Sequence, residues 1–329
     1  MPDDITIKIV MTAPSRVGKT SLLAAMAARI QQEVRKSGFE FLGDDSAPDA
    51  VLEESRARLE RMATGPGMRT EVALGPESTM DKKEFPFTLA HPTFRGIPKI
   101  HLHFVDLPGE WYVGKGRTEV ADKLLQEADV ILVAVDAVAL MENQGKYNKL
   151  VNNPKLICDN IYRRCHERAV PPLVLVVAVK AETYLRAAAG KGLKGKFGED
   201  ELRAKLKESY ERLRALKANA CAVETVGNIV FNDLREDQDT GVPIVTFRRV
   251  EVGYAPRYCS VPLRWIIGKI LEASKKKIDG EKTIIDTLAT MLGLGTDRTE
   301  AIEKLGGMLK KMSESTADGR KVSDLIFDV

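Results

Sequence analysis

Short runs of apolar residues recur along the first half of the chain. The segment from Ile5 to Val10 is rich in β-branched residues, and Val130 to Val135 and Leu173 to Val179 contain no polar residue. Near-continuous runs of this kind are typical of strands in a parallel sheet that is covered on both faces. They therefore predict buried central strands.

Segments with helical patterns fill the gaps between these runs. Helices are expected at about 22–30, 50–62, 119–127, 145–167, 199–217 and 260–275. Because strands alternate with helices, we predict an α/β fold with a doubly wound, mostly parallel sheet and ligands at the carboxyl ends of its strands. Residues 84–90 and 99–106 instead predict an antiparallel hairpin whose second strand enters the core.

Breaks in the pattern predict one large domain followed by an extension. The domain is expected to span 1–276, and the C-terminal helical extension 277–329. Within the extension, 283–292 and 296–312 have the pattern of short amphipathic helices. Helical or irregular insertions are expected at about 39–78, 183–220 and 228–258.

Composition excludes few functions. Fifty basic and 47 acidic residues give a formal net charge of +3, which favours neither nucleic acid nor a membrane surface as a partner. Four cysteines form no C-x-x-C pair, as is typical of reduced thiols. The chain contains no apolar run long enough for a transmembrane helix and no signal-peptide pattern. We therefore expect a cytoplasmic protein.

The strongest local motif follows the first predicted strand. Residues 13–20 read A-x-x-x-x-G-K-T, which matches the P-loop pattern G-x-x-x-x-G-K-S/T except at Ala13. Backbone N–H groups of such a loop and of the following helix start surround a phosphate. Lys19 is then a point charge on the β- and γ-phosphates, and Thr20 places its hydroxyl on Mg²⁺. The nucleotide-binding residues expected here are Ala13, Ser15, Arg16, Val17, Gly18, Lys19, Thr20 and Ser21.

A second motif, Asp106-Leu107-Pro108-Gly109-Glu110, ends a predicted strand. The Asp106 carboxylate can hold Mg²⁺ through water, and Gly109 lets a backbone amide approach the γ-phosphate. With these two motifs, residues 5–275 resemble the Ras-like, translation-factor-related P-loop GTPases. The Asp-x-Pro-Gly-Glu form, the insertions and the tail look most like the bacterial double-GTPase-type proteins. The resemblance implies GTP and GDP as ligands, Mg²⁺ as cofactor and a molecular switch that hydrolyses GTP slowly.

The resemblance also implies an N-K-x-D element that recognises guanine. Its weakened counterpart is Val179-Lys180-Ala181-Glu182. The Lys180 stem can lie over a base, and the Glu182 carboxylate can accept two hydrogen bonds from the guanine edge. A last family element, a loop whose amide contacts the base, falls at 223–227 and includes Thr225. Because both elements depart from the family pattern, ATP stays an alternative to GTP.

The resemblance further implies a switch threonine on Mg²⁺, together with Thr20 and Asp106. It should precede the predicted hairpin, where Thr79 is best placed. The rival positions are Ser78, Thr70 and Thr64.

Three residues are expected to act in hydrolysis: Lys19, Glu110 and Arg16. Glu110 occupies the place where many relatives carry the glutamine that positions water. Arg16 stands where guanylate-binding members of the dynamin group carry an arginine finger in cis. The alternative for Arg16 is an exposed loop residue, or one paired with Glu110.

Two different hypotheses compete with the GTPase. One is a nucleotide-binding scaffold with little turnover that recruits partners through its insertions and C-terminal helices. The other is a P-loop NTPase that uses ATP; a small-molecule kinase is less favoured, because Asp106-x-x-Gly109 is not typical of that class. In each GTP-based hypothesis the expected partners are guanine nucleotide and a protein effector or regulator, not nucleic acid.

Overall fold

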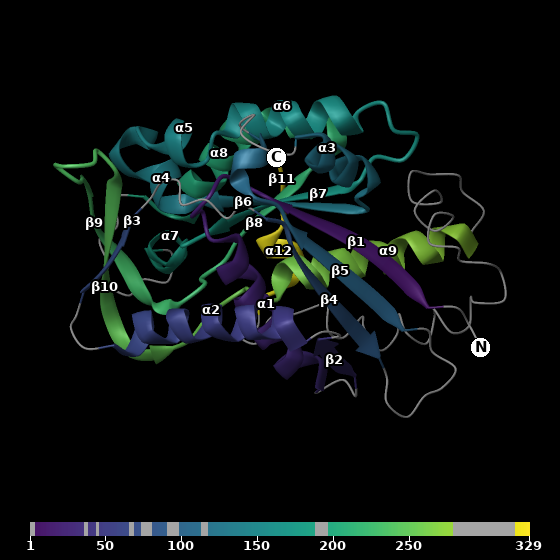
Figure 1. The fold of residues 1–329 in the computed structure, drawn as a ribbon, viewed down its shortest axis with the longest axis horizontal. Helices are drawn as coiled ribbons and strands as arrows, with labels where there is room; N and C mark the ends of the chain where they lie inside the picture. Colours follow the sequence, from purple (N-terminus) through teal and green to yellow (C-terminus); the bar gives the residue numbers. More distant parts are fainter. Residues whose placement is uncertain are drawn as a thin grey trace.

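A computed structural model describes residues 4–35, 39–43, 46–65, 69–73, 81–90, 99–112, 118–187, 197–278 and 320–329. The strands of its central sheet are β1 (Ile5–Thr12), β2 (Glu40–Gly43), β4 (Lys83–Ala90), β5 (Ile100–Asp106), β6 (Val130–Asp136), β7 (Leu173–Val179), β8 (Asn219–Ala222) and β11 (Phe327–Asp328). Within the described ranges these eight strands lie in the order β11-β8-β7-β6-β1-β5-β4-β2. Figure 1 shows them as one twisted sheet.

The helices are α1 (Lys19–Arg35), α2 (Ser46–Thr64), α3 (Thr118–Glu127), α4 (Ala137–Met141), α5 (Asn148–Val151), α6 (Pro154–Cys165), α7 (Glu182–Ala187), α8 (Glu199–Tyr210), α9 (Val261–Ile278) and α12 (Val322–Leu325). Short 3-10 helices are η1 (Gly109–Tyr112), η2 (Glu142–Gly145) and η3 (Glu211–Leu216).

The centre of the sheet is parallel, as the apolar runs predict. β1 pairs in parallel with β5 and β6, β6 with β7, and β7 with β8. β4 pairs antiparallel with β5, which confirms the predicted hairpin. The prediction of a doubly wound, mostly parallel α/β sheet is therefore confirmed.

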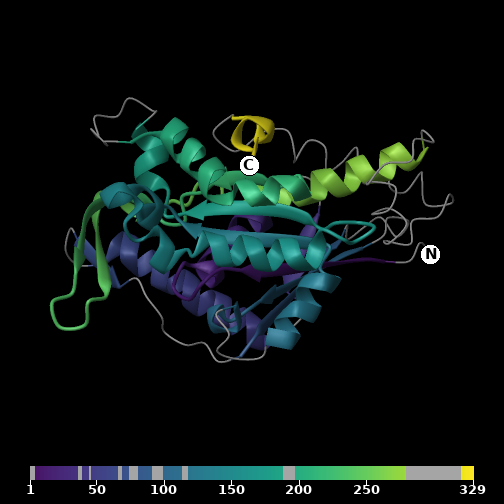
Figure 2. The same cartoon turned by 90° about the horizontal axis from the view of Figure 1, so that it is seen from above.

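Two hydrophobic layers enclose the central strands. Successive side chains of a strand point to opposite faces, so Ile9 packs in one layer and Val10 in the other. The first layer includes Leu22 of α1 and Ile266 of α9, and the second includes Ile161 of α6. Figure 2 shows helices on both sides of the sheet. This burial on two faces explains why β6 and β7 are apolar at nearly every position.

A second sheet was only partly predicted. It consists of β3 (Arg69–Ala73), β10 (Pro243–Tyr254) and β9 (Gly227–Glu236), in that order. Figure 1 shows it at the left of the molecule, beside α2 and α4. The sequence predicted short β-like pieces at 228–258 but few strand signals at 39–78, where β2 and β3 lie. β3 is polar and has no buried position, so its pattern lacks the usual strand signal.

Two segments predicted as single helices are divided. Between α5 and α6, Asn153 has a φ of +43°, and Pro154 begins the next helix, where a missing N–H costs no hydrogen bond. α8 passes into η3 at Glu211.

The end of the chain returns to the sheet. β11 pairs antiparallel with β8, and the Val329 N–H donates to the Ala218 carbonyl at 3.2 Å. This strand was not expected in a helical extension. The amphipathic helices predicted at 283–292 and 296–312 lie outside the described residues.

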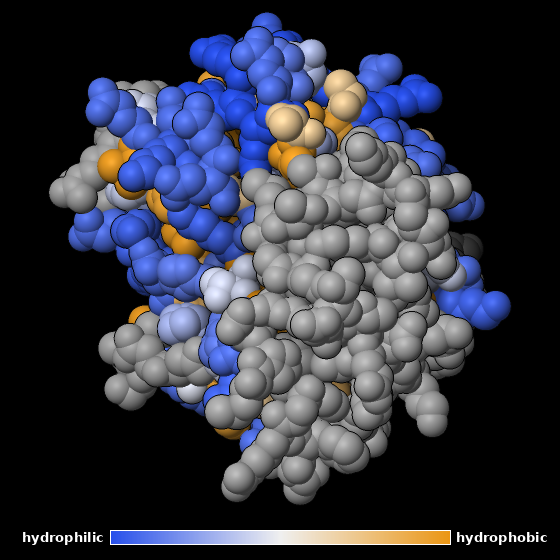
Figure 3. Space-filling model, turned by 90° about the vertical axis from the view of Figure 1, so that its right-hand side faces the viewer, coloured by the Kyte–Doolittle hydropathy of each residue, from blue (hydrophilic) through white to orange (hydrophobic). Residues whose placement is uncertain are grey.

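Large hydrophobic side chains are exposed at few positions in the described ranges, namely Leu42, Val120, Leu150 and Val252. On the face that Figure 3 shows, hydrophilic side chains predominate and hydrophobic ones occupy small areas between them. None of the helices in the described ranges combines the length and hydrophobicity that crossing a bilayer requires.

Candidate nucleotide-binding site

The predicted phosphate loop connects β1 to α1. Its Ala13 and Val17 side chains are buried in the core, and Gly18 has a φ of +117°, a backbone conformation that favours glycine. Ala13 is not among the described residues with positive φ. Alanine therefore replaces the first glycine of the pattern without backbone strain.

Lys19 is the first residue of α1, directly after this loop. Its ammonium donates to the Ala13 carbonyl at 3.0 Å and stands 3.8 Å from Asp106 Oδ1. Burial lowers the pKa of Lys19, while the negative charges of Asp106 and Glu110 oppose that shift. A desolvated ammonium with these partners is prepared for a highly charged anion such as a triphosphate.

The two predicted motifs meet because β1 and β5 are neighbours. Met11 is in register with Asp106, so both strands end at the same edge of the sheet. There the Thr20 hydroxyl donates to Asp106 Oδ2 at 2.7 Å. Ser21 follows in the first turn of α1.

Gly109 packs directly on the phosphate loop. A Cβ at this position would lie 2.3 Å from the Ser15 nitrogen and 2.7 Å from the Pro14 carbonyl carbon. Only glycine fits between these backbones. The next residue, Glu110, accepts a hydrogen bond from the Ser15 hydroxyl through Oε1 at 2.8 Å.

The donor atoms beside the loop suit Mg²⁺. Asp106 Oδ1 is buried and accepts no hydrogen bond from the described residues, and the Thr20 hydroxyl is adjacent. Carboxylate and hydroxyl oxygens are hard ligands of the kind that Mg²⁺ prefers. Thr79 and Ser78 lie outside the described residues. Of their rivals, Thr64 donates to the Glu60 carbonyl in α2, and Thr70 pairs with β10.

Lys180 directly follows β7 and has a left-handed conformation with a φ of +58°. Its ammonium is ion-paired with Asp136 at the end of β6. The Asp136 carboxylate also caps α4 by accepting from the Ala139 N–H at 3.0 Å. The Asp136 backbone N–H donates to Asn152 Oδ1 at 2.8 Å, and the Asp136 carbonyl accepts from Asn152 Nδ2 at 3.0 Å. Asp136 is not among the site residues predicted from the sequence. Its position in the sequence has the same feature as that of Asp106, because each is an aspartate at the end of an apolar strand.

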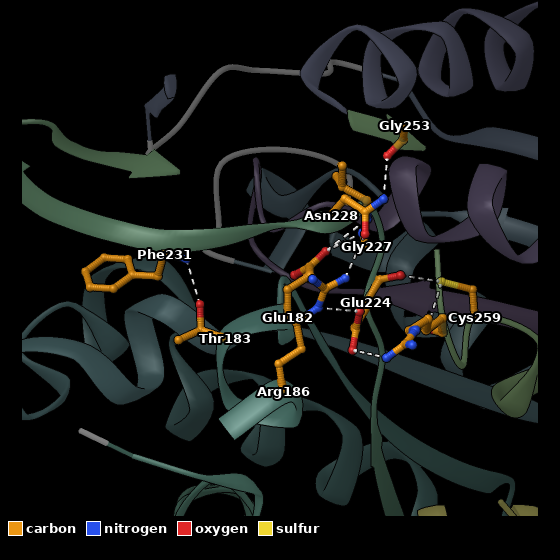
Figure 4. Close-up of polar contacts among 11 residues, drawn as sticks. Glu182, Thr183, Arg186, Glu224, Gly227, Asn228, Phe231, Gly253 and Cys259 are labelled. Carbon is orange, nitrogen blue, oxygen red and sulfur yellow. Dashed lines mark hydrogen bonds and ion pairs between the residues drawn. The ribbon is translucent and has the colours of Figure 1, made fainter. Parts of the chain in front are cut away.

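Glu182 joins α7 to the loop after β8, as Figure 4 shows. The carboxylate is 1% exposed, and its Oε1 accepts from the Val226 N–H at 2.9 Å and from the Gly227 N–H at 3.4 Å. Oε2 has no hydrogen-bond partner in the described part of the chain. Burial raises the pKa of Glu182. The fold thus brings Glu182 to the loop of Thr225 and leaves Oε2 without a donor from the residues that the structure describes.

Glu224 was missed as a member of this group. Its Oε2 accepts from Arg186 Nε at 3.3 Å, and Arg186 also donates to Asn228 at 3.0 Å (Figure 4). Burial first, and then the negative charge of Glu182, raise the pKa of Glu224 from 4.5 to about 7. No sequence motif marks this residue, because its environment depends on α7 and β9 packing together.

We expect Glu224→Gln to alter the pH dependence of stability. The folded protein retains a proton on Glu224 between about pH 4.5 and 7 that the unfolded chain releases. The wild-type free energy of unfolding should therefore fall across this range, by roughly 3 kcal/mol at most, relative to the variant. Urea unfolding of both nucleotide-free proteins at pH 5 and pH 8 measures this difference. An equal change in both proteins would contradict the shifted pKa.

One known protein family matches the part of the chain that contains this site. The family model described as Double-GTPase 2 matches residues 12–237, which is more than half of the chain and contains every motif above. The chain belongs to the Double-GTPase 2 family. Membership places it among the GTP-binding P-loop GTPases.

Solved structures similar to this chain include translation elongation factor SelB from Methanococcus maripaludis, in complex with the GTP analogue GppNHp. It has 12% sequence identity and a TM-score of 0.35, and the match covers 68% of this chain and 31% of SelB. The Ski7 GTPase-like domain of S. cerevisiae, bound to GDP and inorganic phosphate, has 14% sequence identity and a TM-score of 0.38. The match covers 68% of this chain and 44% of the Ski7 chain. The same domain bound to GTP has 14% sequence identity and a TM-score of 0.36. This match covers 68% of this chain and 43% of the Ski7 chain.

The chain thus spans less than half the length of these structures. Among curated proteins, none matches the sequence significantly.

Proposed function

We propose that this protein binds GTP with Mg²⁺, hydrolyses it slowly to GDP and phosphate, and acts as a molecular switch. The observation that carries the proposal is the junction of Lys19, Thr20 and Asp106 at the end of β1 and β5. A buried ammonium, a hydroxyl and a carboxylate whose Oδ1 accepts no hydrogen bond from the described residues are the groups that a metal-bound triphosphate needs.

Each residue has a defined task in this proposal. Lys19 neutralises charge on the β- and γ-phosphates, and backbone N–H groups of residues 15–20 bind phosphate oxygens. Thr20 and Asp106, with Thr79 as a third proposed residue, would hold Mg²⁺, which supplies further neutralisation of the phosphate charge when bound. Lys180 and Glu182, with Thr225 in the facing loop, would bind the base.

Arg16 is proposed to neutralise charge that develops in the transition state. It lies in the phosphate loop with a φ of +62° and a partly exposed side chain. Arg16→Ala should lower the single-turnover rate of GTP hydrolysis by at least about tenfold, because a well-placed arginine finger contributes on the order of 10³-fold or more.

The affinity for GTP should change little in that variant. Arg29→Ala is a matched control, since Arg29 is an arginine on α1 whose guanidinium contacts Gln32 at the surface. If Arg16→Ala hydrolyses GTP as fast as wild type, Arg16 is not a finger.

Two specific observations keep other functions in competition. Glu110 places a carboxylate, which repels a γ-phosphate, where many relatives carry glutamine, and this favours a scaffold with little turnover. Val179 cannot supply the side-chain amide of the N-K-x-D element, which leaves an ATP-using P-loop NTPase as the second alternative. A protein effector or regulator and a cytoplasmic location remain part of the proposal.

Titration with labelled GTP, GDP and ATP, with and without Mg²⁺, tests the binding part of the proposal. GTP and GDP should bind, GTP more tightly with Mg²⁺, and ATP should compete poorly. Equal competition by ATP would replace the GTPase with a general NTPase.

A further inference from the structure

The Ser15 hydroxyl and the Glu110 carboxylate form a bond between the two phosphate motifs. Ser15 Oγ donates to Glu110 Oε1 at 2.8 Å, across 95 positions of sequence. The close packing of Gly109 on the Ser15 nitrogen sets the distance between these two backbones. The contact therefore lies at the junction of the loops that follow β1 and β5.

This contact leaves the carboxylate asymmetric. A serine hydroxyl has one proton to donate, so it can anchor only one oxygen. The other oxygen, Glu110 Oε2, is buried and has no hydrogen-bond partner among the residues that the structure describes. A carboxylate that is fixed through one oxygen, and whose second oxygen accepts no hydrogen bond from the described residues, still has an acceptor for the proton of a molecule bound beside it.

We propose that Ser15 is a positioning residue that holds Glu110 so that Oε2 accepts a proton from the attacking water. The inference rests on the proposed GTP hydrolysis and adds a role for the Ser15 side chain. In this step the water oxygen bonds to the γ-phosphorus, and the bond from that phosphorus to the β–γ bridging oxygen breaks. The electron pair of the broken bond stays on GDP, and the water proton moves to Glu110 Oε2.

Electrostatics explains why such an anchor is needed. Glu110 is a carboxylate next to the site proposed for a negatively charged γ-phosphate, so repulsion would turn an unrestrained side chain away. Glutamine, the residue of many relatives, is uncharged and meets no such repulsion. The hydrogen bond from Ser15 opposes the movement of Glu110 and keeps its second oxygen near the water.

Ser15→Ala tests the inference by single-turnover hydrolysis of GTP with Mg²⁺. The rate should fall by at least about tenfold, while the dissociation constant for GTP stays within about twofold. Ser15→Thr keeps a hydroxyl and should restore most of the rate. Ser209→Ala, which removes a partly buried hydroxyl that accepts from Asn148 instead, should leave both quantities unchanged.

A double-mutant cycle separates positioning from a structural role. If Ser15 acts through Glu110, adding Ser15→Ala to Glu110→Ala should lower the rate no further. Ser15→Gly also lacks the hydroxyl and takes the place of Ser15→Ala if that variant does not fold. A wild-type rate in Ser15→Ala, a fall in affinity as large as the fall in rate, or full additivity in the cycle would overturn the inference.

These outcomes are distinct from failure of the proposed function. If wild-type protein saturated with GTP and Mg²⁺ forms no GDP, the hydrolase proposal fails and this inference fails with it. If the wild type hydrolyses GTP and the Ser15 variants match it, only the positioning role is overturned.

Discussion

Lys19→Ala is expected to abolish detectable binding of GTP, a loss of at least about 100-fold in affinity. The side chain is 8% exposed and its ammonium lies between the Ala13 carbonyl and Asp106, at the start of α1. Without this cation, the Asp106 and Glu110 carboxylates would face the triphosphate without the ammonium whose positive charge opposes theirs. Equilibrium titration with labelled GTP in the presence of Mg²⁺ measures the loss.

The fold should survive this substitution. Burial already disfavours the charged form of Lys19, so its removal also relieves a desolvation cost, and Asp106 keeps its hydrogen bond from Thr20. Lys8→Ala is the matched control: Lys8 belongs to β1, but its ammonium pairs with Glu127 at the surface at 2.7 Å. Wild-type affinity in Lys19→Ala would contradict the assignment of the phosphate loop.

Glu182→Ala is expected to erase the preference for GTP over ATP, which we predict to be at least about tenfold in the wild type. Guanine offers N–H donors at N1 and N2, whereas adenine offers none at N1. Glu182 Oε2 accepts no hydrogen bond from the described residues, so a bond to guanine would not compete with the bonds of Oε1 to the loop. Competition of unlabelled GTP and ATP against labelled nucleotide measures the preference.

Glu182→Gln separates recognition from loop structure. Its amide oxygen can still accept from the Val226 and Gly227 N–H groups, while its NH₂ group would face the base and cannot accept from guanine. Selectivity should therefore fall in Glu182→Gln although the loop stays anchored. Equal competition by GTP and ATP in the wild type would remove the guanine assignment.

The parts of the fold that sequence predicts are those with a local physical cause. β6 and β7 are buried on both faces, so their apolar runs mark them directly. Gly18 in the phosphate loop has a positive φ that favours glycine, and Gly109 in the second motif packs so closely on that loop that no Cβ fits. Such requirements act on single positions and can be recognised one residue at a time.

The parts that were missed depend on distant segments coming together. β3 is a polar strand that exists because β10 lies beside it. The anchoring of Glu182 by the loop after β8 follows from the pairing of β7 with β8, and the raised pKa of Glu224 follows from burial next to Glu182. Neither the Ser15 to Glu110 bond nor the return of β11 to the sheet has a pattern within its own segment.

Conversion of GTP to GDP and phosphate under single-turnover conditions tests the central claim most directly. Wild-type protein in excess over GTP should form GDP faster than buffer alone. Removal of Mg²⁺ with a chelator, or the Lys19→Ala substitution, should reduce the rate of GDP formation to that in buffer. The wild-type protein should not hydrolyse ATP. If bound GTP instead stays intact for as long as free GTP does, the protein is a nucleotide-binding scaffold and not a GTPase that switches by hydrolysis.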